Sequence, residues 1–414
     1  MTGVEAVSTR PGPGTSFVRA TGPWLIDAAG LDHFDATSGS GAATLGHQHP
    51  AVISEVTAQL GALVHTGCKL GSAARERFVA ALGAILPYAD PAVLPTATGG
   101  EAVEAALKVA RAATGGRAVV GFRYGYHGKT AGALALTWRQ SFKDFSAPPD
   151  PSVLRAELPD PRGPVDLPAA LDGFDRVLEQ AAELGGLAAV VLEPVQVTEG
   201  VLAVPPELLD ALAIRTRAAG GLFVLDEIYT GLGRCGQMFY GDLMTSPPDL
   251  TLLGKTLGNG FPIAAVTGER RILDVLPSGV QTSTFSGHPV SCAAATAVIE
   301  TVLAADVPAR AADLGERLAE DLAKLAARHP WLRGVRTVGA LAAMDCADGD
   351  VPGSRLATAV AQGAADRRLL LFTGGPEGAT IKIVPPVLLA ETEYHQLLER
   401  LAGALLAAER DGIA

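Results

Sequence analysis

Two charged residues stand at the ends of strongly apolar segments, where an isolated charge is costly. Asp226 lies near the end of GLFVLDEI (221–228), and Lys255 ends DLTLLGK (249–255). A buried carboxylate needs a partner. Burial also lowers the pKa of a lysine and makes its neutral, nucleophilic amine accessible, as Schiff-base chemistry requires. Read separately, Asp226 could be a cap or an ion pair and Lys255 a surface lysine, so only their joint occurrence indicates a site.

A glycine pair before a predicted helix could hold an anion. Residues 95–111 read PTATGGEAVEAALKVAR, and the pair Gly99-Gly100 lets the backbone approach a ligand closely. The helix that follows offers free N–H groups and the positive end of its dipole, which suit a phosphate group. The same pair could simply make a turn, because short glycine motifs are unspecific.

Four short apolar segments position these residues: 117–123, 187–195, 221–228 and 249–255. Their β-branched content is typical of strands buried on both faces. From about residue 50 such segments alternate with helices, which predicts a parallel sheet with helices on both faces. Ligands of open α/β sheets bind beyond the carboxyl ends of the strands. We therefore expect Glu193, Asp226 and Lys255 to meet in one crevice.

The pattern along the chain predicts two domains. Residues 1–20 are rich in Pro, Gly and Ser and predict an irregular arm, and residues 23–36 predict two short strands around a turn. We assign the arm and these strands (1–50) to a small α+β domain and residues 51–303 to a large domain. Residues 304–414, which read as a long helix, strands and a closing helix, complete the small domain.

The composition excludes several kinds of partner. The chain has 414 residues and a net charge of −11, which argues against nucleic acid and anionic membranes because phosphates attract basic surfaces. No CxxC pair, secretory signal or membrane-length apolar run is found, so the expected protein is soluble and cytoplasmic. The eight histidines are scattered, so no metal site is expected. The cysteines, which read as reduced thiols, are Cys68, Cys235, Cys292 and Cys346.

Seven motifs resemble, in order, those of the class III (omega-type) aminotransferases, which are pyridoxal-phosphate enzymes of the aspartate aminotransferase fold (fold type I). The resemblance implies an α/β fold: a large domain on a mainly parallel seven-stranded sheet flanked by helices, plus a small α+β domain. It extends from Asp35 to Pro386. The motifs are GHQHP (46–50), TGGEAVEAALKVAR (98–111), GYHGKTAGALALT (125–137), LEPVQ (192–196), LDEIYTGLGRCG (225–236), PDLTLLGK (248–255) and TSTFSGHP (282–289).

The resemblance implies a role for each residue of the crevice. Lys255 would form a Schiff base with pyridoxal 5'-phosphate and move the proton at the substrate α-carbon. Asp226 would keep the pyridine nitrogen protonated, since a nearby carboxylate raises its pKa, and Glu193 would orient the cofactor side of the pocket. Thr284 would reach the phosphate from the neighbouring subunit, which implies a homodimer with shared active sites. The other implied cofactor contacts are Gly99, Gly100, Tyr126, His127, Ile228 and Tyr229.

The sequence departs from the family pattern on both sides of the pocket. The phosphate loop lacks a hydroxyl at Gly100, and Tyr229 stands where the family often has Gln. Lys129 and Lys382 replace arginines that often bind substrate carboxylates, and they lose the planar fork. The family's switching glutamate falls at Thr198, with Glu199 next to it.

These departures leave the substrate open. It could carry its amine away from any carboxylate, as in a diamine, an ω-amino acid or an amino sugar. Alternatively, another arginine binds the carboxylate. The candidates are Arg123, Arg139 and Arg234.

The predicted activity is a ping-pong transamination (EC 2.6.1.-) through Lys255. An amino-acid donor, glutamate or alanine, gives its amino group to an oxo or aldehyde acceptor. The alternative is a racemase, epimerase or aminomutase on the same scaffold, which differs only in where the carbanion is reprotonated. A third reading, a cofactor-binding protein without turnover, is disfavoured because both Asp226 and Lys255 are retained.

Overall fold

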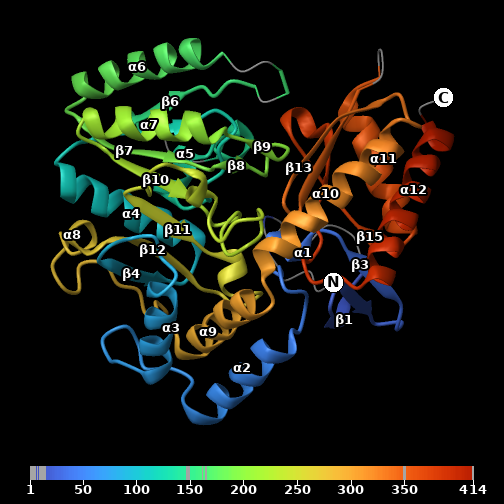
Figure 1. Cartoon of the computed structure of the whole chain (residues 1–414), viewed down its shortest axis with the longest axis horizontal. Helices are drawn as coiled ribbons and strands as arrows, with labels where there is room; N and C mark the ends of the chain where they lie inside the picture. The colour runs from blue at the N-terminus through green and yellow to red at the C-terminus, as the bar shows by residue number, and fades with distance from the viewer. Residues whose placement is uncertain are drawn as a thin grey trace.

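A seven-stranded sheet forms the centre of the protein, with strand order β4-β12-β11-β10-β7-β5-β6 (Figure 1). All neighbours are parallel except β12, which is antiparallel to both β11 and β4. The predicted mainly parallel sheet is therefore confirmed. Its strands are β4 (Pro91–Thr96), β5 (Ala118–Phe122), β6 (Val153–Ala156), β7 (Leu187–Leu192), β10 (Leu222–Asp226), β11 (Leu250–Leu253) and β12 (Ala264–Glu269). The computed structural model describes residues 6, 8, 15–145, 150–160, 162–163, 166–347 and 351–412.

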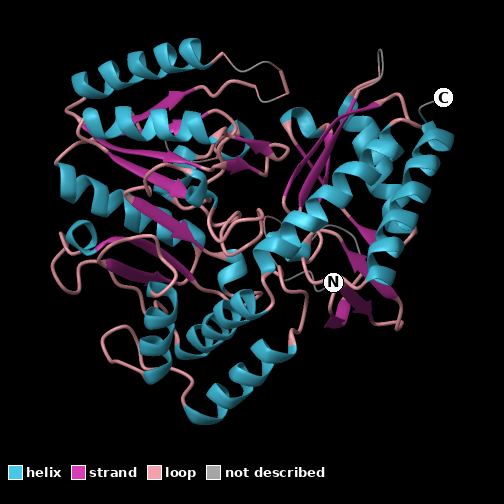
Figure 2. Ribbon diagram, in the orientation of Figure 1, coloured by secondary structure: helices cyan, strands magenta, loops and turns pink. Residues whose placement is uncertain are grey.

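Helices cover both faces of the central sheet (Figure 2), and alternate residues of its strands pack on opposite faces. On β5, Val120 and Phe122 pack with α6 (Leu167–Glu183) and α7 (Pro206–Ala218), whereas Val119 packs with α4 (Gly99–Thr114) on the other face. Both faces are therefore apolar. This is why β5 and β7 carry no polar side chain, and each buried aliphatic side chain contributes about 1.5–3 kcal/mol.

Further elements complete the region built on this sheet, which we call the large-sheet region. Helices α2 and α3 both pack against α9, below the sheet in Figure 1. The predicted strand 187–195 is wrong in its last part, because Pro194 interrupts it and Val195–Gln196 pairs with β9 instead. The bounds are α2 (Pro50–Ala62), α3 (Ala73–Gly83), α5 (Ala131–Leu136), η1 (Gln140–Phe142), β8 (Val195–Gln196), β9 (Leu202–Ala203), η2 (Tyr240–Leu243), η3 (Lys255–Leu257), α8 (Arg270–Leu273) and α9 (Pro289–Ala304).

A second sheet, in the order β13-β14-β17-β16, lies beside α10, α11 and α12. We call this part the C-terminal region. Within the described part of the chain, no single helix has the length and hydropathy to span a membrane, although α9 and α10 do as a pair bent by 66°. The bounds are α10 (Val307–Ala326), β13 (Leu332–Val338), β14 (Leu341–Cys346), α11 (Gly353–Asp366), β15 (Leu369–Leu370), β16 (Phe372–Gly374), η4 (Pro376–Gly378), β17 (Thr380–Ile383) and α12 (Glu391–Gly412).

The N-terminal strands join the C-terminal region. They form a sheet in the order β1-β2-β3-β15, in which β3 pairs in parallel with β15. Arg368 donates to Asp32 at 2.9 Å across a sequence separation of 336 residues. The predicted small domain combines residues 1–50 with residues 304–414, and this pairing of N-terminal strands with β15 agrees with it. We keep the domain boundaries at residues 50 and 303 as a proposal. The bounds are β1 (Phe17–Thr21), β2 (Trp24–Asp27), β3 (Asp32–Asp35) and α1 (Ser38–Gly41).

The irregular arm predicted for residues 1–20 is wrong at its end. Phe17–Thr21 forms β1, because β2 offers it a free edge for antiparallel pairing. Residues 1–5, 7 and 9–14 of the arm lie outside the described residues.

Candidate active site

Three neighbouring parallel strands end at one place. Asp226 is the last residue of β10, Glu193 follows β7, and Lys255 follows β11 after one glycine. The two carboxylates act electrostatically on the Lys255 amine. The structure therefore brings together the three residues that the strand ends were expected to bring together.

Lys255 combines an unusual backbone with a buried amine. It begins η3 with φ of 43°, in the left-handed region that residues other than glycine rarely adopt. Its Nζ lies 3.7 Å from the centroid of the Tyr229 ring. Burial lowers the pKa of Lys255 to about 8, although Glu193 and Asp226 favour its charged form. The amine can therefore lose its proton near neutral pH.

The carboxylate of Asp226 is held by two donors. His127 Nδ1 lies 2.7 Å from Asp226 Oδ2, and the Ile228 N–H donates to Asp226 Oδ1 at 3.2 Å. The backbone of His127 is itself fixed, because its backbone N–H donates to Thr137 Oγ1 at 3.0 Å. In the part of the chain that the structure describes, the buried His127 Nε2 has no partner. His127 thus sets the orientation of Asp226.

Glu193 holds the backbone of the segment that follows β5. Its Oε1 accepts from the Tyr126 N–H at 2.7 Å. Burial, followed by repulsion from Asp226, raises the pKa of Glu193, and burial raises the pKa of Tyr126. The backbone of Tyr126 is thereby held at the same strand end as the Lys255 site.

The glycine pair lies at the first residues of α4. Thr98 caps this helix, since its side chain accepts from the Glu101 N–H at 3.2 Å. A Cβ at Gly99 would lie 2.9 Å from Ile228 Cδ1, whereas a Cβ at Gly100 would meet nothing closer than Thr130 Cγ2 at 3.4 Å. Only glycine therefore fits at position 99 without moving Ile228.

Two of the three predicted substrate residues lie around Glu199. Arg139 Nη2 and Nε donate to Glu199 Oε1 at 2.8 and 3.1 Å. Burial lowers the pKa of Lys382 to about 8, while Glu199 favours its charged form. Lys129 is exposed, with its Nζ 4.2 Å from the centroid of the Phe142 ring.

The other candidate arginines have structural partners. Arg234 is fully buried, and it donates to the Pro385 carbonyl and to Thr44 Oγ1, each at 2.7 Å. Arg123 stacks over Tyr124, with 4.8 Å from its Cζ to the ring centroid. Arg139 is therefore the arginine among the three that lies with Lys382 around Glu199.

Sequence reasoning missed two contacts at this site. It noted Glu199 only as the neighbour of Thr198, whereas Glu199 is the partner of Arg139. It also missed Gly41, where a Cβ would lie 2.7 Å from the Tyr229 hydroxyl oxygen. Both contacts join segments far apart in the chain. The positive φ of Gly41, 84°, explains the residue type but leaves no signal of what it touches.

The donor set fits pyridoxal phosphate. It offers an amine of lowered pKa for an aldehyde, a buried carboxylate for a ring nitrogen, and a helix N-terminus whose first residue, Gly99, has no room for a Cβ beside Ile228. Among the residues that the structure describes, no group of three His, Cys, Asp or Glu side chains is arranged for a metal ion.

Known proteins resemble this chain over almost all of its length. It is 34% identical over 403 residues to acetylornithine aminotransferase of Mycolicibacterium smegmatis, covering 96% of this chain and 95% of that one. It is 32% identical over 390 residues to 4-aminobutyrate aminotransferase GabT of Escherichia coli, covering 92% and 91%. The solved ornithine aminotransferase of Toxoplasma gondii superposes with a TM-score of 0.87 at 26% identity, covering 98% of this chain and 93% of that one. The model of the family Aminotransferase class-III matches residues 6–405. The chain therefore belongs to the class III family of pyridoxal-phosphate-dependent aminotransferases.

Proposed function

We propose that glutamate or alanine donates the amino group, that an oxo acid or aldehyde accepts it, and that Lys255 is the reacting amine of this ping-pong cycle. The observation that carries the proposal is the Lys255 amine, whose pKa is lowered to about 8 by burial while Glu193 and Asp226 face it. When bound, pyridoxal phosphate supplies an electron sink for the charge that develops at the substrate α-carbon.

Lys255 holds and moves the proton at its Nζ. Because its pKa is close to the working pH, the same atom can accept a proton in one step and return it in the next. The Tyr229 ring, 3.7 Å away, stabilises the protonated form through a cation–π contact. Tyr229 would also lie at the cofactor's phenolic oxygen, where the family often has Gln.

Asp226 and His127 would serve the ring nitrogen together. The His127 Nδ1 contact at 2.7 Å fixes the carboxylate of Asp226, and a fixed, buried carboxylate stabilises a proton on a nearby ring nitrogen. Glu193 would act through Tyr126, whose N–H it accepts. Tyr126 and Ile228 would then pack on the two faces of the ring.

The N-terminus of α4 would bind the phosphate through the Gly99 and Gly100 backbone. The close packing of Gly99 on Ile228 supports this proposal, because it brings the helix start to the residue assigned to the ring. Thr284 would add its hydroxyl from a second subunit.

A homodimer is proposed on the same grounds. Thr284 lies on an exposed loop, and its neighbour Phe285 is 59% exposed. The ring of Phe285 lies 5.2 Å from that of His65. Thr66, the next residue, donates to the carbonyl of Leu70 at 3.3 Å, and Leu70 is 66% exposed. Large apolar side chains gathered on one surface favour association. Sedimentation of the purified enzyme as an active monomer would contradict the proposal.

Arg139 and Lys382 are proposed to bind the substrate carboxylates. A second carboxylate, such as that of glutamate, would compete with Glu199 for Arg139. The name of one relative, 4-aminobutyrate aminotransferase, supports an aldehyde acceptor, because 4-aminobutyrate carries its amine on a terminal carbon. Lys129 stays a weaker candidate, since it is exposed beside Phe142.

A cytoplasmic location is also proposed. Its support is that the four cysteines are free, as expected of a reducing compartment.

A single-turnover reaction tests the proposal. The holoenzyme mixed with glutamate or alanine, without acceptor, should release about one equivalent of 2-oxo acid per site. Lys255→Ala should release none, whereas Lys324→Ala, at an exposed lysine of α10, should match the parent. Entry of solvent deuterium at the α-carbon without any oxo acid would favour the racemase alternative and contradict transamination.

A further inference from the structure

Hydrogen bonds from the C-terminal region hold the turn that carries Glu199. It lies between β8 and β9, and its residues Gly200 and Val201 have φ of 115° and 58°. A β-branched residue with positive φ is strained and persists only where the surroundings hold it. The two carbonyls that flank Glu199 both accept from the C-terminal region. The Gly375 N–H donates to the Thr198 carbonyl at 3.2 Å.

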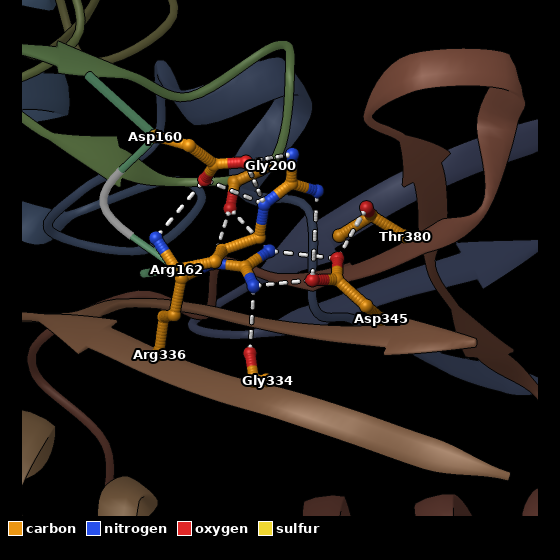
Figure 3. Close-up of polar contacts among 7 residues, drawn as sticks. All are labelled: Asp160, Arg162, Gly200, Gly334, Arg336, Asp345 and Thr380. Carbon is orange, nitrogen blue, oxygen red and sulfur yellow. Dashed lines mark hydrogen bonds and ion pairs between the residues drawn. The ribbon is translucent and has the colours of Figure 1, made fainter. Parts of the chain in front are cut away.

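Arg336 holds the second carbonyl. Its Nη2 and Nε donate to the Gly200 carbonyl at 2.8 and 3.0 Å. The same guanidinium bonds both carboxylate oxygens of Asp345, at 2.5 and 2.8 Å, and the Gly334 carbonyl at 2.7 Å (Figure 3). Thr380 Oγ1 donates to Asp345 at 2.7 Å. Arg336 is therefore fixed to the C-terminal sheet on one side and holds the large-sheet region on the other.

The side chain of Glu199 is bound to Arg139. The two bonds to Arg139 are joined by a third, from Arg139 Nη2 to the Gly375 carbonyl at 3.2 Å. Gly375 thus touches both the turn and the arginine. Arg336 and Gly375 fix the backbone of the turn. The position of this backbone determines whether the Glu199 carboxylate can reach Arg139.

We propose that Arg336 is a positioning residue for substrate selection: by holding the Gly200 carbonyl, it keeps Glu199 on Arg139 and so restricts the access of a second substrate carboxylate to Arg139. The inference rests on the proposed role of Arg139 in binding a carboxylate. A dicarboxylate must displace Glu199 from Arg139, whereas a monocarboxylate need not. Freeing the turn therefore favours dicarboxylates over monocarboxylates.

The same cluster offers a matched control. Arg162 bonds Asp160 at 2.7 Å and approaches Asp345 to 3.9 Å, and its own contacts in Figure 3 do not include the Gly200 carbonyl. Arg336→Met and Arg162→Met remove the same charge from the same cluster. A purely long-range electrostatic effect of the lost charge would move both variants alike, although Arg336 is the more buried of the two and makes the closer contacts with Asp345.

The test measures binding by calorimetry with two unreactive probes on the holoenzyme. Glutarate is a dicarboxylate, and pentanoate replaces one of its carboxylates by a methyl group. Arg336→Met should strengthen the binding of glutarate relative to that of pentanoate by about fivefold to tenfold. In Arg162→Met the ratio of the two affinities should stay within about twofold of the parent's. The ratio of kcat/KM for glutamate to that for alanine should move in the same direction.

A double variant separates positioning from general stabilisation. In a Glu199→Gln background Arg139 has already lost its carboxylate partner, so Arg336→Met should change the glutarate preference much less than it does in the parent. If Arg336→Met does not fold, Arg336→Lys replaces it in the test. The lysine keeps a positive charge beside Asp345 but lacks the planar guanidinium that also reaches the Gly200 carbonyl. Equal weakening of both probes, or an undiminished effect in the Glu199→Gln background, would overturn the inference. A parent enzyme that transaminates neither donor would instead overturn the proposed function.

Discussion

Alanine in place of Gly99 tests the packing between the start of α4 and Ile228. The added Cβ would lie 2.9 Å from Ile228 Cδ1 and 3.3 Å from its Cγ2, whereas carbon atoms pack at about 3.5–4.0 Å. Ile228 must therefore move, and overpacking of this kind costs about 1–3 kcal/mol. Because Ile228 is the proposed ring contact, the affinity for pyridoxal phosphate should fall with the stability.

Gly100→Ala is the matched control. It adds the same methyl group one residue along the same helix, where the nearest side-chain atom is Thr130 Cγ2 at 3.4 Å. The gain in helix propensity, up to about 1 kcal/mol, is similar at both positions, so it cancels in the comparison. The difference between the variants then isolates the contact with Ile228.

The assay is thermal unfolding of the cofactor-free protein, followed by titration with pyridoxal phosphate. For a chain of 414 residues, the entropy of unfolding is about 0.9 kcal/mol/K, so each kcal/mol should lower Tm by about 1 °C. Gly99→Ala should therefore unfold at lower temperature than Gly100→Ala. In an Ile228→Val background, which removes Cδ1 and itself costs about 0.5–1.5 kcal/mol, the penalty at Gly99 should shrink. Equal Tm and equal cofactor affinity in the two alanine variants would refute this reasoning.

Three further predictions concern the reactive amine, its partner carboxylate and the subunit contact. Labelling of Lys255 by an amine reagent in the cofactor-free protein should rise through about pH 8 instead of 10.5, because only the neutral amine reacts and burial lowers its pKa; a midpoint near 10.5 would contradict the burial. His127→Leu removes a donor from the Asp226 carboxylate, so the dissociation constant of pyridoxal phosphate should rise at least about tenfold in an absorbance titration; an unchanged constant would contradict this role of the histidine. Leu70→Asp and Phe285→Asp each place a charge on the exposed apolar surface, so they should weaken the proposed dimer and shift sedimentation toward monomers relative to the parent; a parent-like sedimentation profile would exclude this surface from the contact.

The central sheet and the convergence of the strand ends follow from the sequence. Segments such as LAAVVL have no polar face, so they must be buried on both sides, and parallel strands then bring their carboxyl ends to one edge. Asp226 and Lys255 needed only this rule to be placed together. The roles assigned to them stay predictions that the experiments above address.

The contacts of Glu199 and Arg336 could not be predicted in the same way. The family pattern pointed to Thr198, and a shift of one residue decides which side chain faces Arg139. Arg336 reaches the Gly200 carbonyl from a different sheet, and a backbone acceptor leaves no mark on residue type. Strand β1 was missed because the Pro, Gly and Ser residues before it decided the interpretation of residues 1–20, although its own residues, FVRAT, include Phe, Val and Thr, which favour strands.

The parallel pairing of β3 with β15 sets an order on biosynthesis. A ribosome that adds about 5–20 residues per second takes roughly 20–70 s to pass from Asp32 to Arg368. Throughout that interval the outer edge of β3 has no strand to pair with, and an open edge invites pairing with other chains. The sheet that β1, β2 and β3 begin is therefore completed only when β15, near the end of the chain, has been made. A chain truncated before β15 would leave the edge of β3 unpaired and prone to aggregation.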